Sequence, residues 1–230
     1  MNNWQIFTKA FFTDGGYKNF LTGLQNTAII AVFGLVIGFI LGCLIATVKI
    51  IPKENVFVKT LKGICDVYVM LFRGTPMVVQ LLLMHFALFP MIGLNIDSVM
   101  EAVIIFGMNS SAYMAEILRG GINAVDKGQM EAGRSLGFGF TSTMMRIVLP
   151  QAIKNILPTL GNEFIALIKE TSVVSFIAVM DLTKSFQAIG NSTYEYFVPY
   201  IMLALVYLVL VMLITLLIRV LERRLAKSER

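Results

Sequence analysis

The sequence LTGLQNTAIIAVFGLVIGFILGCLIATV occupies residues 21–48 and contains no charged side chain. Its 28 residues exceed the roughly 20 apolar residues that a helix needs to cross the hydrocarbon core of a bilayer. Residues 74–96 and 197–218 form two further stretches of 23 and 22 residues without Asp, Glu, Lys or Arg. These three stretches predict an all-α integral membrane protein.

The composition of the whole chain supports this prediction. Of the 230 residues, 57% are hydrophobic and only 14% are charged, whereas a soluble domain carries roughly 25% charged residues. Such a composition excludes a disordered chain, a basic nucleic-acid-binding domain and an ordinary soluble enzyme. The two cysteines, Cys43 and Cys65, lie in or beside apolar stretches and are predicted to be small core residues.

Two weaker stretches bring the predicted number of transmembrane helices to five. Residues 101–118 are apolar with charges near both ends, and residues 150–179 carry four charges at Lys154, Glu163, Lys169 and Glu170. The latter stretch can span a membrane only if those charges have partners or line a cavity.

The second span has an irregular point at Gly74-Thr75-Pro76. Proline removes a backbone donor and disfavours helix in the residue before it. We therefore expect one long element from about Val56 to Phe89 that is broken near Gly74–Pro76. Irregular backbone at membrane depth is tolerated where it lines protein or a water-filled cavity, so the break is a candidate cavity wall.

Five spans place the two termini on opposite sides of the membrane, and the distribution of Lys and Arg predicts which side is which. Basic residues gather between spans one and two, between spans three and four, and in the tail: Lys49, Lys53, Lys59, Lys62, Arg119, Lys127, Arg134, Arg146, Arg219, Arg223, Arg224, Lys227 and Arg230. This distribution predicts an external N-terminus and a cytoplasmic C-terminus. The predicted divisions are an N-terminal segment (1–20), a transmembrane domain (21–222) and a cytoplasmic tail (223–230).

Two local patterns concern packing. Trp4, Phe7 and Phe11 fall on one helical face, as in a helix that lies in the membrane interface; a frayed terminus is the alternative. Small residues repeat every fourth position at Gly34, Gly38 and Gly42, which predicts close approach of a neighbouring helix.

The loop between spans three and four, about 120–149, has a distinctive spacing. Glu131-Ala132-Gly133 is followed by Gly137 six residues after Glu131, and by Ile147 ten residues after Gly137. Residues 129–136 are predicted to form a short helix, because glycine is favoured just past a helix end. A short helix that projects into the cytoplasm can fill a groove on a partner protein.

This spacing resembles the EAA loop of ABC importer membrane subunits, with Gly133 in place of the second alanine. The stretches FRGTP (72–76), NSSAYMAEILRGG (109–121) and NEFIALIKETS (162–172) are similar to the polar amino-acid uptake branch of that family, which includes histidine-, glutamine- and arginine-type permeases. The resemblance implies coupling to an ATPase through Glu131, Ala132, Gly133 and Gly137.

The same resemblance implies partners: separate ABC ATPase subunits, an external solute-binding protein and a second permease subunit in a bacterial cytoplasmic membrane. The chain contains no Gly-Lys dipeptide and so no P-loop. We therefore expect no cofactor and no metal in this chain, with ATP and Mg²⁺ bound by the partner ATPase. Nucleic acid is not an expected partner.

Glu163 is the leading candidate for substrate contact. It follows Pro150 by 13 residues, or about 20 Å along a helix, which places it near mid-membrane, where a charge costs about 2.5–3.5 kcal/mol or more. Thr159, Ala166 and Glu170 share its helical face, and Asn162 lies beside it. The carboxylate could hold an ammonium group or a basic side chain; a structural pair with Lys169 or a neighbouring subunit, or a protonated neutral state, are the alternatives.

Other candidate residues lie at the break and in the third span. Gly74, Thr75 and Pro76 could offer free backbone groups and a hydroxyl to an α-carboxylate or amide. Asn109 and Ser110, followed by Ser111, face a cavity or bond to adjacent helices. Arg73 attracts an anion or satisfies loose carbonyls at the break, and His85, the single histidine, bonds to a neighbour or serves as a ligand or proton carrier.

Two other classes of function compete with the importer. An ion-coupled secondary transporter would need an ion or proton site, and the chain shows no internal repeat of the kind expected. An intramembrane enzyme would need clustered acid, base or metal ligands, which the sequence lacks. Within the importer class, the favoured substrates are basic amino acids (arginine, lysine or histidine), and glutamine, glutamate or cystine are the alternative substrates. The permease subunit could pair either with a second copy of itself or with a related chain.

Overall fold

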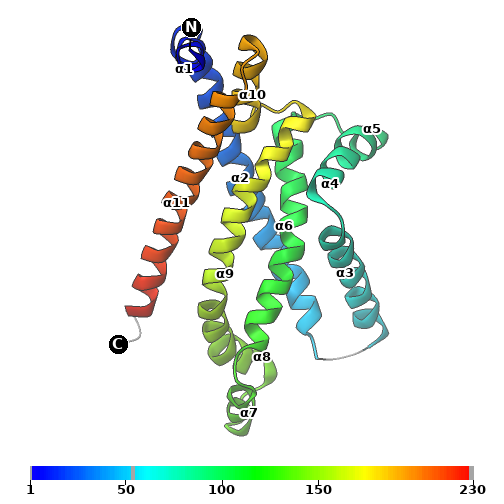
Figure 1. Ribbon diagram of the computed structural model, residues 1–230. Helices are drawn as coiled ribbons and strands as arrows, with labels where there is room; N and C mark the ends of the chain where they lie inside the picture. Colours follow the sequence, from blue (N-terminus) through cyan, green and yellow to red (C-terminus); the bar gives the residue numbers. More distant parts are fainter. Residues whose placement is uncertain (1, 53–54, 228–230) are drawn as a thin grey trace.

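The computed structural model describes residues 2–52 and 55–227, and these residues form helices without any strand (Figure 1). The all-helical class is therefore confirmed. Lys53 and the last three residues of the predicted tail, 228–230, which include Arg230, lie outside the described residues. In chain order the elements are α1 (Asn3–Thr8), η1 (Lys9–Thr13), α2 (Gly16–Ile50), α3 (Val56–Gly74), α4 (Met77–Leu83), η2 (Met84–Leu88), α5 (Phe89–Met91), α6 (Ser98–Asn123), α7 (Lys127–Ser135), α8 (Phe140–Thr143), η3 (Met144–Val148), α9 (Leu149–Glu170), η4 (Thr171–Ile177), α10 (Leu182–Thr193) and α11 (Phe197–Lys227).

Two described helices are long and apolar enough to cross a membrane on their own, α2 and the Phe197–Arg223 part of α11. The α3 helix and the following Met77–Met91 segment count as a third span only as a pair, because they are bent by 107° relative to each other. The helices α6 and α9, with 26 and 22 residues, are long enough but less apolar. The predicted long element from Val56 to Phe89 is thus a sharply bent pair rather than one helix.

The centre of the bundle is the contact between α2 and α6, which lie side by side over most of their length (Figure 1). Gly34, Gly38 and Gly42 of α2 face α6, and a Cβ atom at Gly42 would lie 2.5 Å from the Met114 Cβ. Lipid tails are as apolar as leucine, so close packing rather than hydrophobic burial holds helices together in a bilayer. The predicted packing role of the three glycines is confirmed.

The two ends of the bundle carry different elements. At one end lie α7, α8 and the C-terminal part of α11, and at the other lie the N-terminus, α1 and α10 (Figure 1). The N-terminal segment packs against α10, where Phe7 and Phe11 stack on Phe186 with ring centroids 6.4 and 6.5 Å apart. Trp4 remains 53% exposed.

Candidate functional site

The predicted short helix of the long loop is α7, and it lies at the far end of the bundle (Figure 1). The side chain of Asp126 caps its first turn by accepting a hydrogen bond from the Gly128 N–H at 2.7 Å. Gly137 follows the helix with φ of +87°, a left-handed conformation that favours glycine. The sequence therefore located this helix correctly and predicted the residue that ends it.

The residues of this motif divide between the surface and the core of the loop. Glu131 and Ala132 are exposed, whereas Gly133 is buried against Thr143 and Ile147. Leu136 just beyond α7 is 76% exposed, which sequence reasoning did not single out. The exposed residues of α7 and its C-terminal end thus include a carboxylate and a large apolar side chain.

The break between α3 and α4 lies at Thr75-Pro76, where it was predicted. Gln80 was missed by sequence reasoning, yet its buried amide donates to the Phe72 and Thr75 carbonyls at 2.8 and 2.9 Å. The Asn109 amide donates to the Gln80 side-chain oxygen at 2.8 Å. The polar groups of Asn109 and Gln80 therefore stabilise the break, while Gly74, Thr75 and Pro76 are themselves exposed.

Glu163 lies half-buried on α9 and faces α6. The Ser110 hydroxyl, which is fully buried, donates to the Glu163 carboxylate at 3.4 Å. Asn162 next to it is exposed. The structure thus brings together two of the predicted substrate-binding residues, Glu163 and Ser110, and places Asn109 with the break instead.

A pocket of about 280 Å³ lies between α6 and α9, and neither Glu163 nor Ser110 is among its lining residues. It is lined by Glu116, Ile117, Gly120, Gly121, Ala124, Asn155, Ile156 and Thr159. Thr159 lies one helical turn from Glu163 on α9, so the pocket continues the polar face that the sequence predicted. This pocket lies on the side of Glu163 toward α7.

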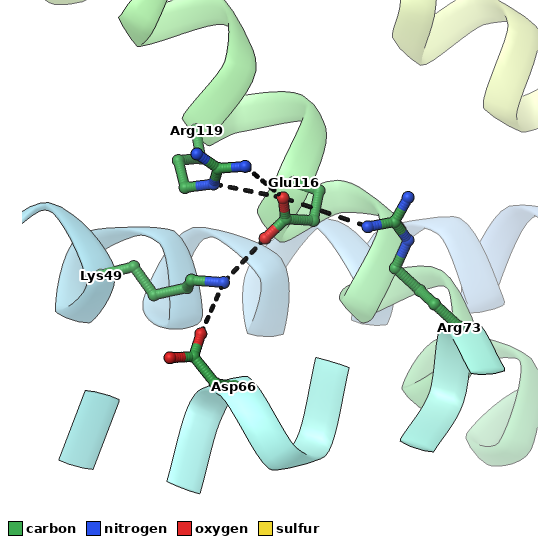
Figure 2. A network of polar contacts seen from close by, with 5 residues as sticks. All are labelled: Lys49, Asp66, Arg73, Glu116 and Arg119. Carbon is green, nitrogen blue, oxygen red and sulfur yellow. Dashed lines mark hydrogen bonds and ion pairs between the residues drawn. The ribbon is translucent and has the colours of Figure 1, made fainter. Parts of the chain in front are cut away.

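Sequence reasoning missed a charged network centred on Glu116 of α6 (Figure 2). The Glu116 carboxylate accepts from Lys49 of α2 at 2.7 Å and from Arg119 at 2.6 Å. Lys49 also pairs with Asp66 of α3 at 2.9 Å, and Arg73 of α3 lies 4.0 Å from Glu116. The network joins three helices whose residues are far apart in the sequence, so no local pattern could have indicated it.

His85 pairs with Glu101 of α6, and both line a pocket of about 450 Å³ near α5. Glu101 is only 6% exposed, so this pair gives a buried carboxylate its hydrogen-bond partner. The expectation that the single histidine bonds to a neighbour is confirmed. Among the residues that the structure describes, no group of three or more His, Cys, Asp or Glu could hold a metal ion.

Comparison with known proteins gives this geometry a context. Residues 34–227 match the family described as "Binding-protein-dependent transport system inner membrane component". The chain is 43% identical over 208 residues to the "Putative glutamine transport system permease protein GlnP" of Rickettsia bellii, which covers 90% of this chain and 91% of the relative. It is 40% identical over 209 residues to the "Arginine transport system permease protein ArtQ" of Bacillus subtilis, with coverage of 91% and 93%.

A solved structure described as an "amino acid ABC transporter with histidines" is similar in both sequence and fold. It is 42% identical, has a TM-score of 0.83, and covers 90% of this chain and 94% of its own. These similarities confirm the resemblance to ABC importer permeases that the loop spacing and the three motifs predicted. The chain therefore belongs to the family of inner membrane components of binding-protein-dependent transport systems.

Proposed function

We propose that this chain is the permease subunit of an ATP-driven importer of polar amino acids, with Glu163 contacting the substrate. The observation that carries the proposal is the half-buried Glu163 carboxylate on α9. Its hydrogen bond comes from the neutral hydroxyl of Ser110 and not from a cationic side chain. A carboxylate at membrane depth without a close cationic partner is costly. A bound ammonium or guanidinium group would supply that partner.

We further propose that the chain crosses the bacterial cytoplasmic membrane five times, through α2, the bent α3–α5 segment, α6, α9 and α11. The N-terminus would lie outside and the C-terminus in the cytoplasm. This topology is supported by the position of α7 and the C-terminal part of α11 at one end of the bundle and of α1 at the other (Figure 1). It also agrees with the predicted concentration of Lys and Arg on the cytoplasmic side.

In this proposal α7 couples the chain to a separate ABC ATPase that binds ATP and Mg²⁺. Glu131 and Ala132 on the exposed side of α7 would enter a groove of the ATPase, while Gly133 and Gly137 shape the helix and its end. Because α7 packs against η3, which leads directly into α9, movement of α7 would be transmitted to the helix that carries Glu163. The path would then open alternately to either side.

The remaining partners follow from this role. An external solute-binding protein would deliver the amino acid, and a second permease subunit, either identical or related, would complete the translocation path. Because α11 leaves large apolar side chains such as Leu213 and Leu217 exposed, lipid is also a partner of the chain.

Basic amino acids are the proposed substrates, because a carboxylate at this depth suits a cationic side chain. Relatives named for glutamine and for arginine are almost equally similar to this chain, so uptake of glutamine, glutamate or cystine is the alternative. The ammonium group of such neutral or acidic amino acids would then be the part that Glu163 contacts.

The test is ATPase activity of the reconstituted permease–ATPase complex with its solute-binding protein, measured across a panel of amino acids. We expect arginine, lysine or histidine to stimulate the wild type, and Glu163→Gln to lose that response while basal hydrolysis continues. Glu222→Gln on α11 provides a matched loss of one carboxylate. Stimulation that is unchanged in Glu163→Gln would contradict the substrate role of Glu163, and uptake without ATP would indicate an ion-coupled transporter instead.

A further inference from the structure

Arg73 is the last charged residue of α3 before the break, yet it does not stabilise the break. Three carbonyls at the break receive hydrogen bonds from other side chains: Leu71 from the Thr75 hydroxyl, Phe72 from Gln80 and Asn109, and Thr75 from Gln80. None of these hydrogen bonds comes from the Arg73 guanidinium, which contacts α6 instead.

The surroundings of Arg73 fix its position but leave most of its donors open. Its guanidinium carbon lies 5.4 Å from the centre of the Tyr113 ring, and one terminal nitrogen lies 4.0 Å from the Glu116 carboxylate. Figure 2 shows the other terminal nitrogen directed away from Glu116. The Arg73 side chain remains 45% exposed, compared with 15% for Lys49 and 17% for Glu116.

The charges of the network do not balance. Lys49, Arg73 and Arg119 are cationic, and only Asp66 and Glu116 are anionic (Figure 2). Lys49 and Arg119 hold the carboxylates at 2.6–2.9 Å, whereas the single ion-pair contact of Arg73 is at 4.0 Å. Arg73 can therefore accept an anion without giving up a short ion-pair contact.

Arg73 and Glu163 lie along the same part of α6. Tyr113, beneath the Arg73 guanidinium, is three residues after Ser110, which donates to Glu163, and residues three apart are neighbours on a helix surface. A cationic group and an anionic group therefore flank one short stretch of α6.

We propose that Arg73 binds the α-carboxylate of the transported amino acid, while Glu163 contacts its ammonium group or cationic side chain. The two opposite charges match the two charges of a zwitterion. The guanidinium fork can also form two parallel hydrogen bonds to one carboxylate, which an ammonium group cannot do. This assignment rests on the proposed function, because it names the second half of the site that Glu163 begins.

The test compares amino acids with analogues in which only the α-carboxylate is changed. Binding of L-arginine, L-glutamine and their α-carboxamides is measured on the permease–ATPase complex in lipid nanodiscs without the solute-binding protein, which could itself select for a carboxylate. The pH is kept low enough for the α-amino groups of both amides to be protonated. We expect the wild type to bind each amino acid about 10- to 100-fold more tightly than its amide, as expected for hydrogen bonds between charged groups.

In Arg73→Gln this preference should disappear, so that acid and amide bind equally and the affinity for the amide stays close to that of the wild type. Arg73→Lys keeps the charge but not the fork, and should retain only part of the preference. Arg219→Gln, which removes an exposed cation from α11, should behave like the wild type.

A general loss of structure would weaken acid and amide together and leave their ratio unchanged, and that result in Arg73→Gln would overturn the assignment. If Arg73→Gln does not assemble, Arg73→Lys decides the matter, because an unchanged ratio there contradicts the role of the fork. Absence of saturable binding by either amino acid in the wild type would instead overturn the proposed amino-acid site, and the role of Arg73 with it.

Discussion

Gly133 in the loop around α7 allows a sharp test of how this loop is packed. The EAA pattern has alanine at this position, but an alanine Cβ here would lie 2.5 Å from the Cγ2 and 3.0 Å from the Oγ1 of Thr143. Thr143 is fully buried, and its hydroxyl donates to the Gly139 carbonyl at 3.1 Å. Rotation of Thr143 to avoid the clash would therefore break that hydrogen bond.

Two opposing contributions set the size of the effect of Gly133→Ala. Replacing glycine by alanine inside a helix stabilises the helix by about 1 kcal/mol, whereas forcing an extra methyl group into a packed site costs about 1–3 kcal/mol. The net expectation is a loss of about 1 kcal/mol in the local stability of α7. Since 1.4 kcal/mol corresponds to a factor of ten, amide hydrogens in α7 should exchange about fivefold faster.

Hydrogen–deuterium exchange of the purified complex, read on peptides covering residues 129–136 and 143–148, measures this change directly. Thr143→Ser alone removes a buried methyl group and should lower the local stability by about 1 kcal/mol. Exchange should therefore also become faster in this variant. The double variant should exchange more slowly than either single variant, because the serine leaves room for the alanine Cβ. Gly63→Ala in α3, where a Cβ meets no atom within 4 Å, is the matched control and should not change exchange in α7.

Faster exchange in the double variant than in both single variants would refute this reasoning, because it would mean that Gly133 and Thr143 do not compete for the same space. Slower exchange in Gly133→Ala alone would show that helix propensity outweighs the clash. The loop would then tolerate the usual alanine without any change in Thr143.

Three further predictions concern the stability of the bundle. Gly38→Ala places a Cβ 2.7 Å from a side chain of α6 and should lower the melting temperature of the purified complex by the equivalent of about 1–3 kcal/mol, whereas Gly63→Ala should not lower it. His85→Ala leaves the Glu101 carboxylate buried without this partner and should destabilise the complex by about 1–3 kcal/mol. Glu101→Gln should destabilise it less, because the glutamine amide can still bond to the His85 ring. Equal losses of stability in the two variants would contradict the pairing. Gln80→Leu removes the donor to two backbone carbonyls at the break and should speed hydrogen exchange at the start of α4, and unchanged exchange there would mean that another group satisfies them.

Much of the architecture follows from local sequence. The uncharged stretch 21–48 lies within α2, because a long apolar helix is the simplest structure whose backbone is satisfied in a bilayer. The break at Pro76 and the helix end at Gly137 were predictable for the same local reason, since each depends on the backbone of a few adjacent residues. The α6 and α9 helices were harder to predict because they are less apolar, and only the structure shows that the polar cluster Asn109, Ser110 and Ser111 of α6 is buried inside the bundle.

The candidate site was predictable only in part. Glu163 was identifiable from its depth within an apolar helix, and Ser110 from its place in a polar cluster. Gln80 and Glu116 were not, because a glutamine or a glutamate near a helix end has no distinctive sequence context. The role of Asn109 at the break likewise depends on Gln80, which lies 29 residues away in the sequence.

By itself, then, the sequence determined that this chain is a helical membrane protein of the importer family, where its helices break, and where the short helix of the loop around Glu131 lies. These properties depend on hydropathy, backbone preference and the spacing of adjacent residues. Only the tertiary structure decided which charges meet. Lys49 and Glu116 are 67 residues apart in the chain, and the packing of α2 against α6 alone brings them together. The packing of α3 and α9 against α6 likewise places Arg73 over Tyr113 and Glu163 beside Ser110, because such contacts depend on distance in space and not on separation along the chain.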